Sequence, residues 1–275
     1  MVAQHYPRRS SPMSWAWGVI SLVTALLAVW VLWAEQGADD PGQALVDMRV
    51  DAEVERDIPE FGTLTVVQER KDRFYEFLLP MVEAENRRIR LKRDQLAQWQ
   101  ALADSGEELS SRNVQRLTDW AHRYYVETEQ PLQDVLDELW LKVDELPPSL
   151  VVAQAANESA WGTSRFAREG NNLFGQWCFS PGCGLVPQSR PAGETYEVRR
   201  FDEPLQSVRG FMLNLNRHFS YEDLRAERAA LRERGETVTG VDLAPHLLAY
   251  STRREAYVEE IVGMINFNNL LDLDQ

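Results

Sequence analysis

The chain has 275 residues, 44% of them hydrophobic, and this content excludes an intrinsically disordered protein. Its formal net charge of −14 excludes nucleic acids and anionic lipid surfaces as expected partners, because both would repel it. A chain of this length has room for one ordinary catalytic domain and a smaller accessory segment.

The first element in chain order is an uncharged, apolar run at residues 13–34. As a helix these residues would span about 33 Å, which is enough to cross a hydrocarbon core of about 30 Å. Arg8 and Arg9 precede the run and acidic residues follow it, so we expect residues 1–12 to stay in the cytoplasm and the remainder to be exported. The length of the run favours an uncleaved transmembrane signal anchor over a cleaved signal peptide, which is the alternative.

Residues 35–65 are acidic and contain proline and glycine, which indicates a linker. A helix is predicted from about Val66 to Ala103, because apolar residues recur there at the 3.6-residue spacing of one helix face: Phe74, Phe77, Leu78, Met81 and Val82. We expect Pro80 to kink or interrupt this helix, because it lacks a backbone donor. Further helices are predicted at 111–125 and 131–144, so residues 66–146 form an N-terminal helical segment.

Pro147 and Pro148 mark the start of the predicted catalytic domain, residues 147–275. Its first helix is expected at 149–159. The helical period vanishes between Gly184 and Phe201, where the turn-rich sequence RPAGE separates two extended stretches and predicts a β-hairpin. The remaining helices are expected near 204–216, 221–234, 241–248 and 255–270. The expected fold class is therefore mainly α, with one β-hairpin and a preceding transmembrane helix.

The chain contains two cysteines, Cys178 and Cys183, in the sequence WCFSPGCG. Pro181 and Gly182 between them form a tight turn that can bring the two sulfurs within bonding range. A local disulfide is expected in an exported chain. The spacing does not fit a zinc site, which needs four ligands, or a thiol redox motif.

The candidate for chemistry is Glu158, at the end of the helix predicted at 149–159. Its neighbours along this helix are small: Ala153, Ala155, Ala156 and Ala160. Close packing of another helix against them would partly bury the Glu158 carboxyl, raise its pKa and keep it protonated near neutral pH, as a general acid requires. The structural alternative is that Glu158 caps a neighbouring helix or pairs with an arginine such as Arg165.

Several motifs occur together in a fixed order. QAANESAWGTS runs from Gln154 to Ser164, and NNLFG follows at 171–175. WC at 177–178, PGCG at 181–184, YEVR at 196–199 and YSTR at 250–253 come after them. Together they resemble the signature of bacterial β-N-acetylglucosaminidases of glycoside hydrolase family 73, and most of all the Bax-type subgroup of Gram-negative bacteria. The resemblance covers about residues 65–270 and is most specific at 151–184.

The resemblance implies a lysozyme-like helical fold with a cleft, and hydrolysis of peptidoglycan glycan strands after N-acetylglucosamine. Glu158 matches the catalytic acid of the family. Asn172, Phe174 and Gln176 fall in the segment that lines the cleft, and Tyr250 matches a tyrosine that faces the acid. The structural alternatives are that Phe174 belongs to the core and that Asn172 forms an Asx turn. With the apolar run at 13–34, we expect an inner-membrane anchor with the catalytic domain in the periplasm, or secretion to the periplasm if the anchor is cleaved.

A second catalytic carboxylate is less well defined. An inverting mechanism needs a base about 6.5–9.5 Å from the acid, and a retaining mechanism needs a nucleophile at about 5–5.5 Å. Some relatives place a glutamate late in the first hairpin strand, where this chain has QSR at 188–190. Glu197 is the preferred candidate, with Glu194 and Asp202 as alternatives. The acetamido group of the substrate can also act as an internal nucleophile.

Neither a cofactor nor a metal is predicted, because the four histidines are scattered without metal-ligand spacing. Two further functions stay open beside the hydrolase. One is a lytic transglycosylase, which would leave an anhydro-muramic end in place of a reducing N-acetylglucosamine. The other is a non-catalytic glycan-binding or regulatory cell-wall protein.

Overall fold

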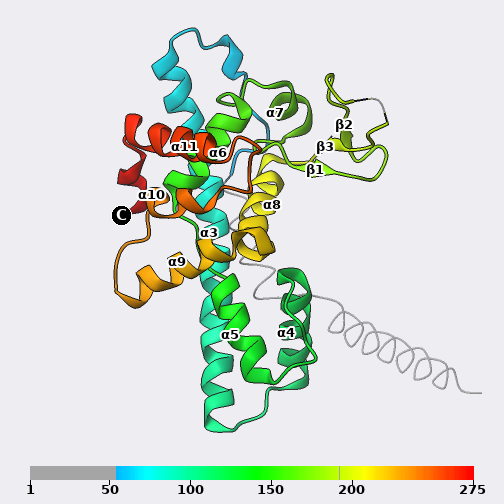
Figure 1. Cartoon of the computed structure of the whole chain (residues 1–275), viewed down its shortest axis with the longest axis vertical. Coiled ribbons are helices and arrows are strands. Elements are labelled where there is room, and N and C mark those ends of the chain that lie inside the picture. The colour runs from blue at the N-terminus through cyan, green and yellow to red at the C-terminus, as the bar shows by residue number, and fades with distance from the viewer. Residues whose placement is uncertain (1–53, 192) are drawn as a thin grey trace, which may run out of the picture. The chain divides into compact units, whose positions relative to one another are not determined.

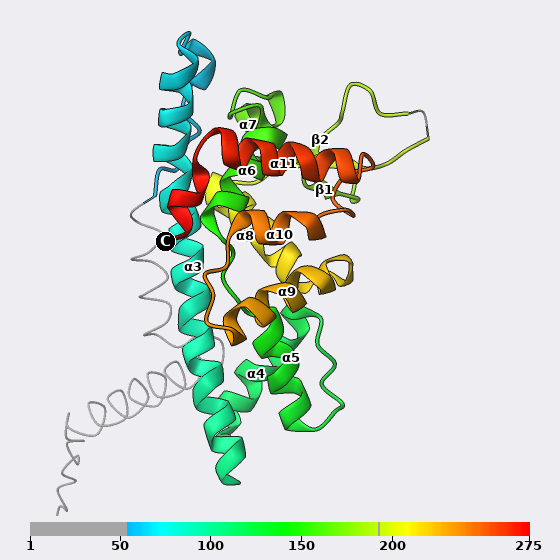
Figure 2. The same cartoon turned by 60° about the vertical axis from the view of Figure 1, so that its left-hand side comes forward.

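The computed structural model describes residues 54–191 and 193–275. The predicted membrane segment at 13–34 and the cytoplasmic segment at 1–12 lie outside these residues. Within the described part of the chain, no helix is both long enough and apolar enough to cross a membrane. This part is mainly helical with one small sheet, which confirms the mainly α part of the predicted fold class (Figures 1 and 2).

The described helices, strands and 3-10 turns all belong to one compact unit of the chain. The helices are α3 (Val67–Ser105), α4 (Ser111–Tyr124), α5 (Leu132–Lys142), α6 (Pro148–Ser159), α7 (Arg165–Gly170), α8 (Pro204–Arg217), α9 (Glu222–Glu233), α10 (Gly240–Leu243) and α11 (Glu255–Phe267). The strands are β1 (Trp177–Cys178), β2 (Gly184–Leu185) and β3 (Glu197–Arg199), and the 3-10 turns are η1 (Phe61–Thr63), η2 (Phe219–Tyr221), η3 (Ala244–His246) and η4 (Leu270–Asp274).

Helix α3 is 39 residues long and carries the apolar stripe predicted from its sequence. All five residues of that stripe are buried in the core. The expected interruption at Pro80 was wrong, because the helix continues through this residue. Pro80 lies on the exposed side, and its loss of one backbone bond costs about 3 kcal/mol. Burial of the flanking Phe77, Leu78 and Met81 offsets this cost, at about 1.5–3 kcal/mol for each side chain.

Helices α4 and α5 pack beside the C-terminal half of α3, at the bottom of Figure 1. The first turn of α4 is capped by Ser110, whose hydroxyl accepts a hydrogen bond from the backbone N–H of Asn113 at 3.3 Å. The helix expected at 241–248 is shorter than predicted and divides into α10 and η3. Helix α7 was not predicted, because six residues are too few to show a helical period.

Helix α6 lies among α3, α10, α11 and η4, and it contacts all four (Figure 2). Ala153, Ala155 and Ala156 are buried, so the neighbouring helices approach closely. The first turn of α6 is held by the carboxylate of Asp274, near the C-terminus of the chain. This carboxylate accepts hydrogen bonds from the backbone N–H of Ser149 at 2.9 Å and from its hydroxyl at 2.5 Å. The start of the helix is therefore fixed by residues far away in the sequence.

The sheet has the strand order β1-β3-β2, and both pairs are antiparallel. The predicted hairpin corresponds to β2 and β3, with Leu185 opposite Val198. Strand β1 pairs with the other edge of β3, and the predicted disulfide closes the loop between β1 and β2. Cys178 and Cys183 are bonded to each other, with their Cα atoms 6.2 Å apart. The strands and their connecting loops extend from the helices at the right of Figure 1.

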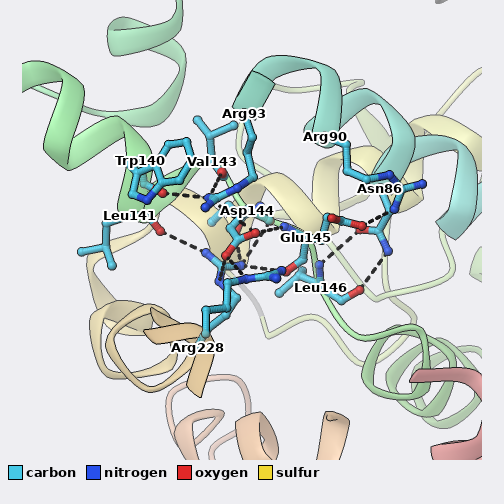
Figure 3. A network of polar contacts seen from close by, with 12 residues as sticks. Asn86, Arg90, Arg93, Trp140, Leu141, Val143, Asp144, Glu145, Leu146 and Arg228 are labelled. Carbon is cyan, nitrogen blue, oxygen red and sulfur yellow. Dashed lines mark hydrogen bonds and ion pairs between the residues drawn. The ribbon is translucent and has the colours of Figure 1, made fainter. Parts of the chain in front are cut away.

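A buried polar network connects α3, α8 and α9 to the segment between α5 and α6 (Figure 3). At its centre the Asp144 carboxylate lies 3.5 Å from the guanidinium of Arg93, 3.4 Å from that of Arg228 and 2.7 Å from that of Arg232. The backbone carbonyl of Asp144 also accepts a hydrogen bond from the Asn216 side chain at 2.8 Å.

Arg228 is the most buried member of this network, with 0% of its surface exposed. Its guanidinium donates to the backbone carbonyls of Leu141 and Glu145 and to the side-chain oxygen of Asn216. Burial lowers the pKa of Arg228 to about 10, and the charge of Asp144 counteracts this effect. Residues 66–146 and 147–275 therefore share charged contacts and a core. That the first part is an accessory segment and the second the catalytic domain stays a prediction.

Replacing Asp144 with asparagine should strongly destabilise the protein, because it leaves buried arginines without their carboxylate. We expect Asp144→Asn to lower the free energy of unfolding by about 3–5 kcal/mol. Urea denaturation measures this difference. Asp137→Asn is the matched control on the exposed side of α5 and should change stability by less than about 0.5 kcal/mol. Equal stabilities of the two variants would contradict the role given to the network.

Candidate active site

Glu158 lies in the last turn of α6 and is half-buried. Removal of its carboxyl from water is the largest influence on it and raises its pKa above the ordinary 4.5. The backbone of Gly175 approaches the same carboxyl closely, since a Cβ atom on Gly175 would lie 3.6 Å from Glu158 Oε2. The carboxyl therefore lies between the end of α6 and the NNLFG segment, in the environment predicted for a general acid.

Tyr257 of α11 orients the Glu158 carboxyl. Gln154, one turn earlier on α6, donates a hydrogen bond from Nε2 to the Tyr257 hydroxyl oxygen at 2.9 Å. The Tyr257 hydroxyl in turn hydrogen-bonds to Glu158. Because its oxygen already accepts from Gln154, the phenol is available to donate its proton to Glu158. This bond lowers the pKa of Glu158 and partly offsets the effect of burial.

Two charged residues, one just before α11 and one within it, act on Glu158 with opposite signs. Arg253 lowers the pKa of Glu158, and Glu260 raises it. The two are paired with each other at 2.7 Å, so their effects partly cancel. Sequence reasoning gave no role to Tyr257 or Glu260. Their three-residue spacing on one helix was a signal that they share a face, but it did not show that this face meets Glu158.

The chain after Glu158 follows an unusual backbone path. Ala160, Trp161 and Gly162 have φ values of 50°, 58° and 77°, all in the left-handed region. Left-handed backbone costs roughly 1–2 kcal/mol for each residue other than glycine. Glycine is required at 162 for a second reason, because a Cβ atom there would lie within 3 Å of the Phe61 ring. These constraints explain the glycine in the WG pair that follows the acid.

Contacts on both sides stabilise this turn. The Ser159 hydroxyl donates to the Ala155 carbonyl at 2.6 Å and accepts from the Gly162 N–H at 2.8 Å. The Trp161 ring packs edge-on against Phe74 and Tyr75 of α3, with ring centroids 5.7 Å apart in both cases. The N-terminal half of α3 therefore supports the end of α6 that carries Glu158.

Asn172, predicted to bind substrate, is buried and uses its whole amide within the protein. Its nitrogen donates to the carbonyls of Gln176 and Arg199, and its oxygen accepts from the backbone N–H groups of Phe174 and Gln176. The bond to Phe174 is the Asx turn named as the alternative. The structure thus places Asn172 between the NNLFG segment and β3, where it fixes the backbone.

Phe174 and Gln176 are held against α8. Phe174 is buried and stacks on Phe211, with ring centroids 4.0 Å apart and planes 6° from parallel. The Gln176 amide pairs with Ser207, donating to its carbonyl at 2.8 Å and accepting from its hydroxyl at 2.8 Å. Both side chains therefore pack inward, and it is the backbone of this segment at Gly175 that meets the acid.

Tyr250, which the resemblance predicts to face the acid, contacts both α11 and the NNLFG segment. Its ring stacks on Tyr257, with centroids 5.4 Å apart, and its hydroxyl donates to the Phe174 carbonyl at 2.8 Å. Burial raises the pKa of Tyr250 well above 10, and the charges of Tyr257 and Glu158 add to this effect. The phenol therefore stays neutral and connects the NNLFG segment to α11.

Glu197, the predicted second carboxylate, is buried on β3 and holds the disulfide loop. Its two oxygens accept hydrogen bonds from the backbone N–H groups of Gly182 at 3.0 Å and Gly184 at 2.8 Å. These bonds lower the pKa of Glu197 and keep it ionised. The sulfurs of Cys178 and Cys183 lie near this carboxylate, but they are bonded to each other and do not offer the thiolates that bind metals.

A helical unit with a half-buried, tyrosine-bound carboxyl at the end of an alanine-rich helix has the features of a glycosidase domain. The family model for mannosyl-glycoprotein endo-beta-N-acetylglucosaminidase matches residues 136–270. Protein bax of Escherichia coli (strain K12) is 32% identical over 203 residues, which cover 74% of this chain and 71% of that protein. No solved structure matches the chain. The chain therefore belongs to the Bax-type glucosaminidase family, as its motifs predicted.

Removing the Tyr257 hydroxyl should raise the pKa of Glu158 further, because the ionised carboxylate loses a donor while its burial remains. We expect Tyr257→Phe to shift the titration of Glu158 to higher pH, measured by carboxyl ¹³C NMR with Glu158→Gln to assign the signal. Tyr221→Phe changes another buried tyrosine and should leave the Glu158 titration in place. A downward shift in Tyr257→Phe would show that the tyrosine does not stabilise the charged form.

Proposed function

We propose that this protein is a peptidoglycan hydrolase, an endo-β-N-acetylglucosaminidase that cleaves glycan strands after N-acetylglucosamine. The observation that carries the proposal is the position of Glu158, half-buried beside Gly175 with its pKa raised by burial. Membership of the glucosaminidase family supports a glycosidic bond as the target. An acid held protonated at higher pH than an ordinary glutamate suits protonation of a sugar leaving group.

In the proposed reaction, Glu158 gives its proton to the glycosidic oxygen as the bond from that oxygen to C1 of N-acetylglucosamine breaks. Tyr257 keeps the carboxyl oriented. The charges of Arg253 and Glu260 change the pKa of this carboxyl in opposite directions. Because the pKa of Glu158 is raised, the protonated and active form persists above pH 4.5 and is lost as the pH rises through the shifted value. Water then attacks C1. In a direct attack its proton passes to solvent, which also reprotonates Glu158; if the acetamido group has bonded to C1 first, the proton of the water returns to the Glu158 carboxylate.

We assign Glu197 a positioning role in this mechanism, in place of the catalytic role predicted from the sequence. Both of its oxygens are engaged by the amides of the disulfide loop, so a reacting sugar would have to displace those bonds. The loop joins strands β1 and β2 of the sheet, and β1 begins two residues after Gly175. Glu197 would then act on catalysis by keeping this sheet in place.

We also propose that residues 13–34 anchor the enzyme in the inner membrane and that the catalytic domain works in the periplasm. The uncharged run and its preceding arginines support the anchor. The disulfide between Cys178 and Cys183 supports an oxidising compartment outside the cytoplasm. Cleavage of the anchor would instead release the enzyme into the periplasm, and the size of the protein in membrane and soluble fractions distinguishes these two cases.

Mass spectrometry of purified peptidoglycan after digestion tests the assigned reaction. We expect the unmodified protein to release fragments with reducing N-acetylglucosamine ends and Glu158→Gln to release at least about 100-fold less, as is typical when a general acid is removed. Anhydro-muramic ends would identify a lytic transglycosylase instead. Absence of any fragments, while a control muramidase releases them from the same sample, would favour the non-catalytic glycan-binding function.

The same digestion distinguishes the two roles of Glu197. If it positions the loop, Glu197→Gln should retain part of the activity, and its loss should match that of the Cys178→Ser/Cys183→Ser variant. Combining the changes should then add little, because they act through one loop. A loss as complete as that of Glu158→Gln, with an unchanged melting temperature, would make Glu197 the second catalytic carboxylate.

A further inference from the structure

An exposed pair of aromatic rings lies on the sheet, next to the segment that meets Glu158. Trp177 of β1 and Tyr196, just before β3, stack with centroids 4.4 Å apart and planes 8° from parallel. Trp177 is 56% exposed, and the following Phe179 is 69% exposed. Large apolar side chains that stay open to water in this way are a common mark of a binding surface.

We propose that the exposed face of Trp177, backed by Tyr196, binds a sugar ring of the glycan strand beside the cleavage site. The inference deepens the proposed function and rests on it for the identity of the glycan. Neither the stacked pair nor Trp177 was assigned a role from the sequence. The platform would hold the strand while Glu158 acts on the neighbouring bond.

The distance along the chain supports this placement. Two peptide steps separate Gly175, whose backbone meets Glu158, from Trp177. Because an extended chain advances at most about 3.6 Å per residue, the Cα atoms of these two residues lie within about 7 Å of each other. A glycan strand bound at Glu158 would therefore lie within reach of β1, the strand that carries Trp177.

Contacts within the protein hold the backbone of the platform before any ligand binds. Trp177 pairs with Val198 across β1 and β3, and the disulfide at Cys178 closes the loop directly beyond it. The carboxylate of Glu197 holds the same loop through its two amide bonds. A surface whose side chains are already ordered loses little entropy on binding, so such a contact contributes more to affinity.

The chemistry of the pair suits a sugar better than a protein partner. The face of an aromatic ring carries partial negative charge, and it attracts the weakly positive C–H groups on the flat side of a pyranose. Trp177 and Phe179 would bury at most about 150–250 Å² each, which is well below the roughly 800 Å² per partner of a stable protein interface. A single ring on a glycan strand matches this small area.

Co-sedimentation with insoluble peptidoglycan tests the inference, using the full chain with Glu158→Gln so that binding is measured without turnover. In this background we expect Trp177→Ala to weaken binding about tenfold, as for a central aromatic contact, and Trp177→Phe to retain most of it. Trp140→Ala is the matched control, because Trp140 is an exposed tryptophan on α5 and should leave binding unchanged. Melting temperatures of all the variants report any loss of the fold.

The outcomes separate this inference from the proposed function. Binding that depends on Trp177 while the unmodified protein releases no fragments would uphold the platform and reject the hydrolase. Cleavage by the unmodified protein with equal binding by Trp177→Ala would reject the platform alone. Equal losses in Trp177→Ala and Trp177→Phe, with lower melting temperatures, would assign the ring pair to stability of the sheet and overturn the inference. Self-association that Trp177→Ala abolishes would also overturn it in favour of a second copy of the chain.

Discussion

The close packing of α6 against α3 and α11 is the constraint on which the site depends. Small side chains at Ala153, Ala155 and Ala156 allow the neighbouring helices to approach, and their approach removes the Glu158 carboxyl from water. The same packing brings Tyr257 of α11 within hydrogen-bonding distance of Gln154 and Glu158. Burial and hydrogen bonding have opposite effects on the pKa of Glu158, and burial is the larger.

The helices outside the matched family segment take part in building this site. The family model begins at residue 136, in the middle of α5, yet α3 supports the left-handed turn after Glu158 through Phe74 and Tyr75. Farther along α3, Arg93 shares the Asp144 carboxylate with arginines of α9. A polar network of this kind is costly to break, because each arginine left without its partner remains buried. Helix α3 is therefore part of the structure that positions the acid.

Features set by local sequence could be predicted, and those set by distant contacts could not. The apolar stripe of α3, the Ser110 cap and the hairpin follow from spacing and side-chain chemistry within a few residues. The disulfide between Cys178 and Cys183 follows from a short turn between them. Glu158 was recognisable because the small residues on its own helix, which allow other helices to pack closely around it, are visible in the local sequence. Continuation of α3 through Pro80 was missed, because burial of residues on the opposite face outweighs the local preference.

The roles of the remaining residues depend on tertiary contacts. Asn172 lies in a motif that predicted substrate binding, but its partners include the Arg199 carbonyl on β3. Glu197 was chosen as a second carboxylate from strand position alone, whereas its oxygens meet amides of a loop bent back by the disulfide. Tyr257 contacts Glu158 only because α11 returns to α6. The periodicity of one segment does not show which distant residues that segment will contact.

The central claim is that Glu158 supplies a proton to the leaving group, and a comparison of leaving groups tests it most directly. A sugar alkoxide needs this proton, whereas dinitrophenolate leaves without it. We therefore predict that Glu158→Gln loses most of its kcat/KM on a chitooligosaccharide but retains much of it on a dinitrophenyl glycoside of the same sugars. Equal losses on the two substrates would contradict the assignment of Glu158 as the general acid.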